Sequence, residues 1–422
     1  MIEMLKNNSR TIQMISGWFL AIAPSIIFYL LPQSNWAFIL FVVSLFVIYK
    51  IKANNIIKGI LAAVMLFAVM PAVGLENTYY LDVITQVGIY VSLAIGLNIV
   101  VGFAGLLNFG FVAFYAFGAY FYAIFATSQA GNFIPAAIAH FPVSGNWFWL
   151  FLIFGALLSG LLGFLLGLPV LRLRGDYLAI VTLGFAEIIR ILFNNMDKPI
   201  NFTNGPKGLS PIQPPEFFGY MLNQPIHFYF IVLVVVILTI IIAKRLDASR
   251  IGRAWASIRE DELAARSMGI PVVRMKLLAF VIGASFAGAM GVIFAAKQTF
   301  IDPSSFGFME SIGILCMVLL GGMGSVSGAV MGAAAVVLLQ LNILKEFSDY
   351  LGQLSAMGIL NIPSQVDPAK YEKMVFGLIL ILVCIFRPQG ILPSKRYLPS
   401  WFKNKQENTI SPKEEDPDVA RS

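Results

Sequence analysis

Long apolar runs, separated by shorter polar stretches, dominate the chain. A helix that crosses a membrane needs about 20 mainly apolar residues at a rise of about 1.5 Å each. The apolar runs are 12–31, 36–49, 59–75, 83–101, 109–127, 147–171, 178–195, 228–243, 277–298, 308–320, 326–344 and 371–386. Two of them, 36–49 and 308–320, are short for a helix that crosses the membrane. The pattern predicts an all-α, polytopic transmembrane helical bundle of about ten to twelve spans.

The composition supports a membrane protein. Of the 422 residues, 58% are hydrophobic and 12% are charged, whereas soluble domains have about 45–50% and about 25%. A soluble domain and a disordered chain are both excluded. The formal net charge of +7 would suggest a nucleic-acid partner in a soluble protein. Here the placement of Lys and Arg in membrane loops explains it, so we expect no nucleic acid.

Lysine and arginine gather in five clusters, which twelve crossings would place on one side of the membrane. The largest spans residues 244–276, and the others lie within 6–10, 50–58, 172–174 and 387–405. The loops between these clusters carry few basic residues. By the positive-inside rule this side is cytoplasmic, so both chain termini are expected in the cytoplasm.

Two glycine-containing segments, 101–110 and 320–328, interrupt apolar runs. Each has a Gly-x-x-Gly core, formed by Gly102 with Gly105 and by Gly321 with Gly324. Such interrupted helices are typical of the central pathway of transporters. Close packing of helices through small residues is the alternative interpretation.

Four polar residues in apolar runs are candidates for the translocation path. Asn98 and Asn108 flank the first glycine segment and could offer amide contacts to a solute, although such residues more often form interhelical hydrogen bonds. Glu187 and Arg190 are three residues apart, so they share one helix face and can pair. The pair either lines the path of a zwitterionic amino acid or fixes helix packing.

The sequence contains no motif for nucleotide binding or for catalysis. It lacks the Gly-x-x-x-x-Gly-Lys-Ser/Thr phosphate loop, the His-Glu-x-x-His motif and the Gly-x-Ser-x-Gly motif. Cys316 and Cys384 lie in apolar runs, far in sequence from His140 and His227, so we assign no metal. We expect neither an enzyme nor a cofactor bound by this chain.

The basic stretch at 251–271 predicts a short amphipathic helix. Trp255, Ile258 and Ala265 can share an apolar face, and Gly269 followed by Pro271 is a C-terminal stop signal. A helix of this kind between two spans suits the docking of a partner. A charged loop on the membrane surface is the alternative.

This stretch resembles the cytoplasmic loop of the permease subunits of ABC importers, whose signature is Glu-Ala-Ala, three residues, then Gly. Here it reads Glu262-x-Ala264-Ala265-x-x-x-Gly269, one residue longer, and the usual Ile-x-Leu-Pro downstream is missing. That departure is typical of the branched-chain amino acid permeases. Runs at 172–184, 204–209 and 318–325 resemble the LivM-type branch of that family in the same order. The resemblance covers about residues 80–390.

The resemblance implies a permease subunit that imports leucine, isoleucine and valine across a bacterial inner membrane. Its implied partners are a sister permease subunit, two cytoplasmic ATPase subunits and a periplasmic solute-binding protein. ATP and Mg²⁺ would bind the ATPases. The loop 244–276 would dock in an ATPase cleft, with small residues that permit close backbone approach. The coupling residues implied are Arg259, Glu260, Asp261, Glu262, Ala264, Ala265 and Gly269.

On this basis the chain divides into three parts. Residues 1–75 form an N-terminal extension with about three membrane helices, 76–395 form the permease domain, and 396–422 form a polar cytoplasmic tail. The proline-rich loop 196–227 is predicted to be stiff, extended and outward-facing, and we expect it to help dock the binding protein.

Two alternative functions stay open. Within the family, the solute could instead be urea, a short amide or another amino acid. In a different class, an ion-coupled secondary transporter would use the glycine segments and Glu187 by itself. Such a carrier has no need of an ATPase-docking loop.

Overall fold

The computed structural model describes residues 22–30, 35–50, 55–133, 141–170, 173, 175–356, 372–387 and 389–392. Most of the first predicted helix at 12–31 and the whole polar tail lie outside these residues. Residues 22–30 are helical.

Helices occupy each of the other eleven predicted apolar runs, to within a few residues. The named helices of the described residues are α2 (Asn35–Lys50), α3 (Asn55–Val64), α4 (Met70–Glu76), α5 (Thr78–Asn98), α6 (Phe111–Ala126), α7 (Phe148–Val170), α8 (Asp176–Asn195), α9 (Pro225–Ala248), α10 (Arg250–Glu260), α11 (Glu262–Ser267), α12 (Val272–Gln298), α13 (Phe308–Gly321), α14 (Val326–Leu338), α15 (Leu344–Ala356) and α16 (Glu372–Phe386). Of these, α10, α11 and α15 lie outside the predicted apolar runs. The π-helical turns η1 (Met65–Val69), η2 (Ile99–Phe103) and η7 (Leu339–Ile343) continue these helices.

Short 3-10 helices and a β-hairpin lie between them: η3 (Ser128–Asn132), η4 (Gly145–Trp147), η5 (Gly205–Lys207), η6 (Pro303–Phe306), β1 (Glu216–Phe217) and β2 (Tyr220–Met221). The all-α prediction is therefore confirmed. Among the described residues, seven helical segments are long and apolar enough to cross a membrane, and three apolar helices are shorter. The seven begin at Lys58, Thr78, Gly145, Tyr177, Pro225, Val272 and Val326.

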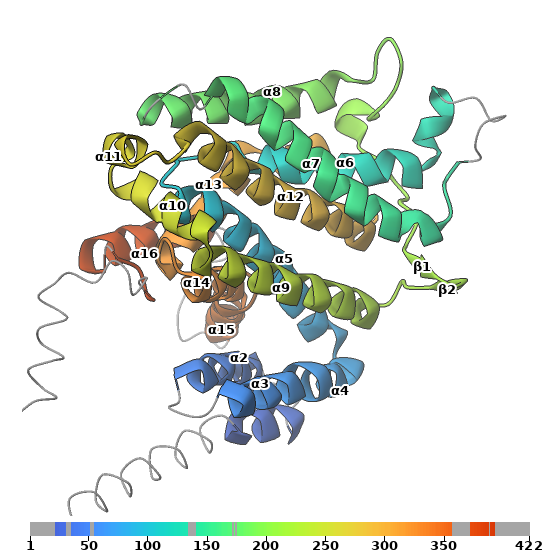
Figure 1. Ribbon diagram of the computed structural model, residues 1–422. Helices are drawn as coiled ribbons and strands as arrows, with labels where there is room; N and C mark the ends of the chain where they lie inside the picture. The colour runs from blue at the N-terminus through green and yellow to red at the C-terminus, as the bar shows by residue number, and fades with distance from the viewer. Residues whose placement is uncertain are drawn as a thin grey trace, which may run out of the picture.

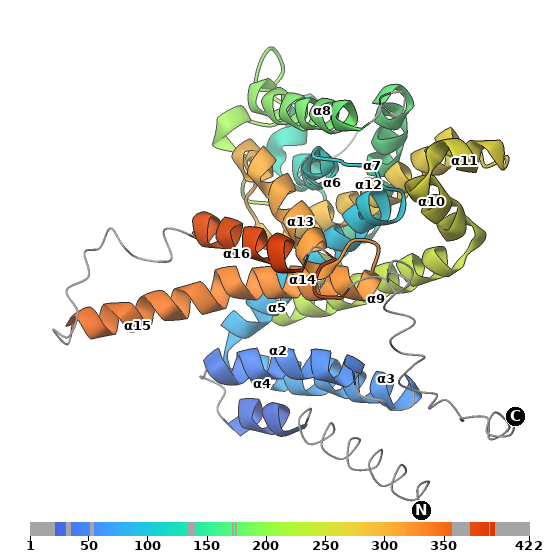
Figure 2. The same ribbon diagram turned by 90° about the vertical axis from the view of Figure 1, so that its left-hand side faces the viewer.

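Helices α5 and α12 lie in the middle of the bundle, with α8 along one side and α2 to α4 along the opposite side (Figures 1 and 2). Small residues allow α12 to approach its neighbours closely. A Cβ at Gly283 would lie 2.9 Å from the carbonyl oxygen of Gly96 on α5, and one at Gly288 would lie 2.5 Å from that of Gly155 on α7. Many of the glycines of this sequence thus serve helix packing.

The two ends of the bundle differ. The end with α10 and α11, here called the loop end, also carries the two glycine segments and residues 389–392; the hairpin β1–β2 lies at the other end, here called the far end (Figure 1). At the far end the proline-rich loop is folded back rather than extended. Leu209 pairs with Ile301 as an antiparallel bridge, and Asn204 Nδ2 donates to the carbonyl oxygen of Gly208 at 2.9 Å.

Helix α14 runs through η7 into α15, so it extends to Ala356 rather than ending near residue 344. The extension is polar, but it contacts the N-terminal helices. The side-chain amide of Asn35 donates to Glu346, and the hydroxyl of Tyr80 donates to Asn35 Oδ1 at 2.7 Å. These contacts give the extra turns of helix a partner that hydropathy alone does not reveal.

Candidate coupling site

Helix α10 begins immediately after α9, at a tight turn capped by Ser249. The Ser249 hydroxyl accepts hydrogen bonds from the backbone nitrogens of Ile251 at 3.1 Å and Gly252 at 3.3 Å, which satisfies two unpaired donors of the first turn. A Cβ at Gly252 would lie 2.5 Å from the carbonyl oxygen of Asp247. Glycine therefore lets α10 fold directly back from the end of α9.

The predicted apolar face of this loop is buried. Trp255, Ile258 and Ala265 are each at most 5% exposed. Trp255 donates from Nε1 to the carbonyl oxygen of Met275 at 2.7 Å, and Ile258 and Ala265 pack with Val272 at the start of α12. The loop is thus fixed to the bundle through both α9 and α12.

The loop holds two helices where one was predicted. Asp261 has extended backbone angles, and its carboxylate accepts from the backbone nitrogens of Leu263 at 2.8 Å and Ala264 at 3.0 Å. It therefore ends α10 and caps α11. Gly269, with φ +81°, ends α11 as the stop signal predicts.

Glu262 ties α11 to α12. Its carboxylate contacts Lys276 Nζ at 2.8 Å and Arg266 at 3.4 Å. The Lys276 side chain is only 8% exposed, so its charge requires a partner at this position. The acidic residue of the loop signature thus serves the internal structure of the loop.

Arg259 points from α10 into the bundle and contacts the first glycine segment. Its guanidinium donates a hydrogen bond to the carbonyl oxygen of Gly102 in η2. A Cβ at Gly105, where φ is +72°, would lie 3.0 Å from Arg259 Cγ. Beside this contact Phe103 stacks on Trp255 with ring centroids 6.3 Å apart.

Asn98 joins the first glycine segment to the second. Its Oδ1 accepts from the backbone nitrogen of Gly324 at 2.9 Å. A Cβ at Gly102 would overlap this Oδ1 and lie 2.5 Å from the Gly324 nitrogen. Arg259, Gly102, Asn98 and Gly324 therefore form one continuous series of contacts from the loop to both glycine segments.

The rest of the first segment is held by its own polar groups and by α8. Asn108 Oδ1 accepts from the backbone nitrogen of Gly110 at 2.8 Å, and Thr182 Oγ1 accepts from that of Phe109 at 3.1 Å. The amide nitrogens of Asn98 and Asn108 are buried without a hydrogen-bond partner among the described residues. Two donors thus stay available beside the glycine segments.

The second segment packs against backbone. A Cβ at Gly321 would overlap the carbonyl oxygen of Gly328 on α14. The backbone nitrogens of Ile391 and Leu392 donate to the carbonyl oxygens of Leu320 at 3.0 Å and Gly321 at 2.9 Å. These bonds satisfy acceptors that the end of α13 leaves unpaired.

Glu187 and Arg190 pair with each other on α8, as their spacing predicts. Arg190 Nε lies 2.9 Å from Glu187 Oε1, and the side chains are 37% and 33% exposed. Among the described residues, no hydrogen bond or ion pair joins them to Asn98, Asn108 or the glycine segments, and α8 lies at the side of the bundle (Figure 1). The structure does not bring this pair together with the other predicted path residues.

The outer surface of the loop includes two apolar side chains that are not among the predicted coupling residues. Leu263 is 70% exposed and Met268 is 83% exposed, next to the exposed Glu260 and Ala264. Their positions depend on the separate orientation of α11, so an uninterrupted helical pattern does not identify them.

The helical bundle with its compact loop site defines a multi-pass helical membrane protein. The chain matches, over residues 79–384, the family described as the permease component of the branched-chain amino acid transport system. The chain therefore belongs to this permease family, as its resemblance to the LivM-type branch predicts. The match begins next to Thr78, where α5 begins.

Two curated relatives are high-affinity branched-chain amino acid transport system permease proteins named LivM. The one from Salmonella typhimurium strain LT2 is 39% identical over 338 residues, which cover 75% of this chain and 70% of the relative. The one from Escherichia coli strain K12 is 38% identical with the same coverage. The permease protein LivH of E. coli K12 is 34% identical over 145 residues, or 34% of this chain and 40% of LivH. No solved structure matches the chain.

Proposed function

We propose that this chain is the transmembrane permease subunit of an ATP-driven importer of branched-chain amino acids in a bacterial inner membrane. Family membership supports the class of solute. The observation that carries the coupling role is the contact between Arg259 of α10 and the carbonyl oxygen of Gly102, because it joins an exposed loop to a glycine segment inside the bundle.

In this proposal the loop end faces the cytoplasm, as the basic residues of the loop predict. Glu260, Leu263 and Met268 form the surface that meets an ATPase subunit. ATP and Mg²⁺ bind to the ATPase subunits and not to this chain. Arg259, on the inner side, passes movement of the loop to the glycine segments. Asp261 and Glu262 keep the two loop helices in place, and Ala264 and Gly269 leave room for the partner backbone.

The remaining partners follow the same orientation. A sister permease is supported by the partial similarity to LivH. A periplasmic solute-binding protein would meet the far end, where the hairpin exposes Phe218 to 92%. Within the bundle, the unpartnered amide donors of Asn98 and Asn108 are the groups we assign to the solute path.

The first test is a mild-detergent pull-down of the full chain from its native membrane, read by mass spectrometry. We expect two ATPases with phosphate-binding loops and a second permease in the eluate. Membrane vesicles loaded with ATP should then take up labelled leucine only when binding protein is present, and unlabelled isoleucine or valine should compete.

Two results would overturn the proposal. A chain that elutes alone and takes up leucine on an ion gradient is an ion-coupled carrier. Competition by urea or short amides, with none by isoleucine or valine, would assign a different solute to the same importer class.

The docking surface is tested separately by Glu260→Arg combined with Leu263→Asp. Both side chains are exposed, so the fold should be retained while ATP-driven uptake is lost. Lys207→Glu, an exposed substitution at the far end, is the control and should leave ATPase binding unchanged. Normal uptake by the loop variant would refute the docking role.

A further inference from the structure

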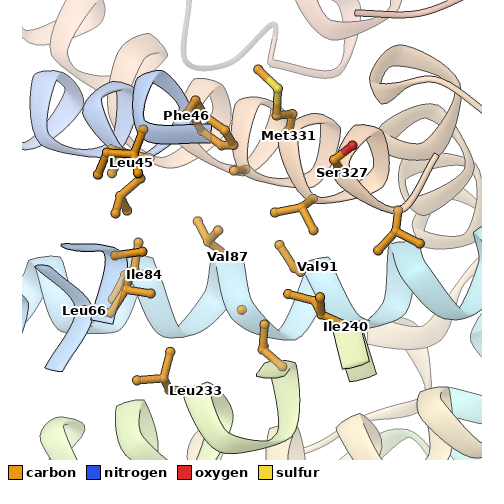
Figure 3. A pocket seen from close by; sticks show the side chains of 18 of the residues that line it. Leu45, Phe46, Leu66, Ile84, Val87, Val91, Leu233, Ile240, Ser327 and Met331 are labelled. Atoms are coloured by element: carbon orange, nitrogen blue, oxygen red, sulfur yellow. The ribbon is translucent and has the colours of Figure 1, made fainter. Parts of the chain in front are cut away.

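An apolar groove of about 470 Å³ lies between the N-terminal helices and the permease bundle. Its walls come from α2, α3, α5, α9 and α14 (Figure 3). Leu45 and Phe46 of α2 face Val87 and Val91 of α5 across it (Figure 3). The volume is in the range of small-molecule sites, about 300–1,000 Å³. Since these helices are membrane spans or neighbours of spans, the groove lies at membrane depth.

The groove extends along α9. Its lining includes Tyr229 and Lys244 of that helix, which are separated by about 22 Å at a rise of about 1.5 Å per residue. The hydrocarbon core of a bilayer is about 30 Å thick, so one leaflet contributes about 15 Å. The Tyr229 hydroxyl donates to the carbonyl oxygen of Leu66 at 2.7 Å, which links α9 to the N-terminal helices near that end. The groove is therefore long enough for an acyl chain of one leaflet and its headgroup.

The charged groups of the groove are basic. Lys58 near the start of α3 and Lys244 near the end of α9 both line it, and no lining residue among those described is acidic. Lys244 lies in the last turns of α9 before α10, so the positive charge is toward the loop end. Apolar walls with cationic groups suit a lipid with an anionic headgroup, and basic pockets between membrane helices are known sites for such headgroups.

The groove is open beside α3. Gly59 lines it and is exposed, and a Cβ placed there would meet nothing within 4 Å. A lipid can therefore enter from the membrane without displacing a helix.

We propose that this groove binds an acidic glycerophospholipid, with its phosphate at Lys58 and Lys244 and an acyl chain along the apolar walls, so that the lipid joins the N-terminal helices to the permease bundle. The site is separate from the loop contacts, and its occupant is independent of the transported solute.

The direct test is native mass spectrometry of the delipidated full chain in detergent, titrated with dioleoyl phosphatidylglycerol or with dioleoyl phosphatidylcholine. We expect tighter binding of phosphatidylglycerol. Lys58→Gln and Lys244→Gln should each reduce that preference about fivefold, which corresponds to about 1 kcal/mol per lysine. Arg245→Gln is the matched control: it removes a charge next to Lys244 that does not line the groove, and it should change little.

Filling the groove is the second test. Gly59→Leu should abolish retention of phosphatidylglycerol, whereas Gly184→Leu, at another open glycine on α8, should not. The charge variants keep the proposal testable if Gly59→Leu does not fold. Equal binding of both lipids, an equal loss in Arg245→Gln, or unchanged retention in a folded Gly59→Leu variant would each overturn it.

Discussion

The two glycine segments look alike in sequence but are held in different ways. In the first, Gly102 and Gly105 contact the side chains of Arg259 of α10 and Asn98 of α5, and its end, at Gly110, packs against backbone, that of Thr182 on α8. The second, at Gly321, packs against the backbone of α14 and of residues 391–392. Side chains can rotate at low cost, whereas interlocked backbones move only together.

The difference assigns different roles to the two segments. The first can respond to movement of the loop, because Arg259 reaches it directly. The second is suited to act as a rigid unit. It would move together with the first segment because the Asn98–Gly324 hydrogen bond joins the two. Substitutions at the individual contacts test this division.

Substitution Gly321→Ala should be the most damaging, because its Cβ would overlap the backbone of Gly328 and force α13 and α14 apart. We expect the free energy of unfolding to fall by about 3 kcal/mol, measured by thermal unfolding in detergent. Gly313→Ala on the same helix places its Cβ in open space and is the control. Equal stability of the two variants would contradict a rigid second segment.

Substitution Asn98→Ala leaves the buried Gly324 nitrogen without an acceptor, so the free energy of unfolding should decrease by about 2 kcal/mol. Leucine uptake should decrease with it, since the two segments are no longer joined. Ser92→Ala, which removes a buried hydroxyl of α5 that has no partner among the described residues, should be nearly neutral. A stable Asn98→Ala variant with full uptake would show that the hydrogen bond does not couple the two segments.

Substitution Arg259→Ala should separate coupling from stability. The charge-assisted hydrogen bond to Gly102 is worth about 1.5 kcal/mol, so ATP-driven uptake should decrease about tenfold. ATPase binding, which depends on the outer surface, should persist in a pull-down. Arg253→Ala, an exposed change on the same helix, is the control. If both variants lose uptake equally, the loop acts through its total charge.

Substitution Glu187→Gln should have the smallest effect. A partly exposed pair within one helix contributes about 0.5 kcal/mol or less, so stability should be nearly unchanged and uptake should change less than twofold. The measurements are thermal unfolding and labelled leucine uptake. A tenfold loss of uptake with normal stability would place the pair on the solute path.

The loop illustrates how far the sequence could predict the site. The spacing of Trp255 and Ile258 correctly predicts the buried face of α10, because a helix repeats its faces at a fixed period. Ala265 is buried as predicted, but it lies on the separate helix α11. The same spacing does not predict that Asp261 divides the loop into two helices. An aspartate looks the same in the sequence whether it caps a helix or lies within one. It also cannot place Arg259 against Gly102, a contact across 157 positions.

The amino-acid sequence was enough to predict the all-α membrane class, most of the helix positions and the family, because hydropathy and local motifs are properties of consecutive residues. Tertiary structure alone decided which glycines meet side chains and which meet backbone. It also decided that α15 continues α14 and that a groove with Lys58 and Lys244 lies beside α2. These features depend on which helix surfaces face each other, and helices of nearly uniform hydrophobicity carry little record of their neighbours.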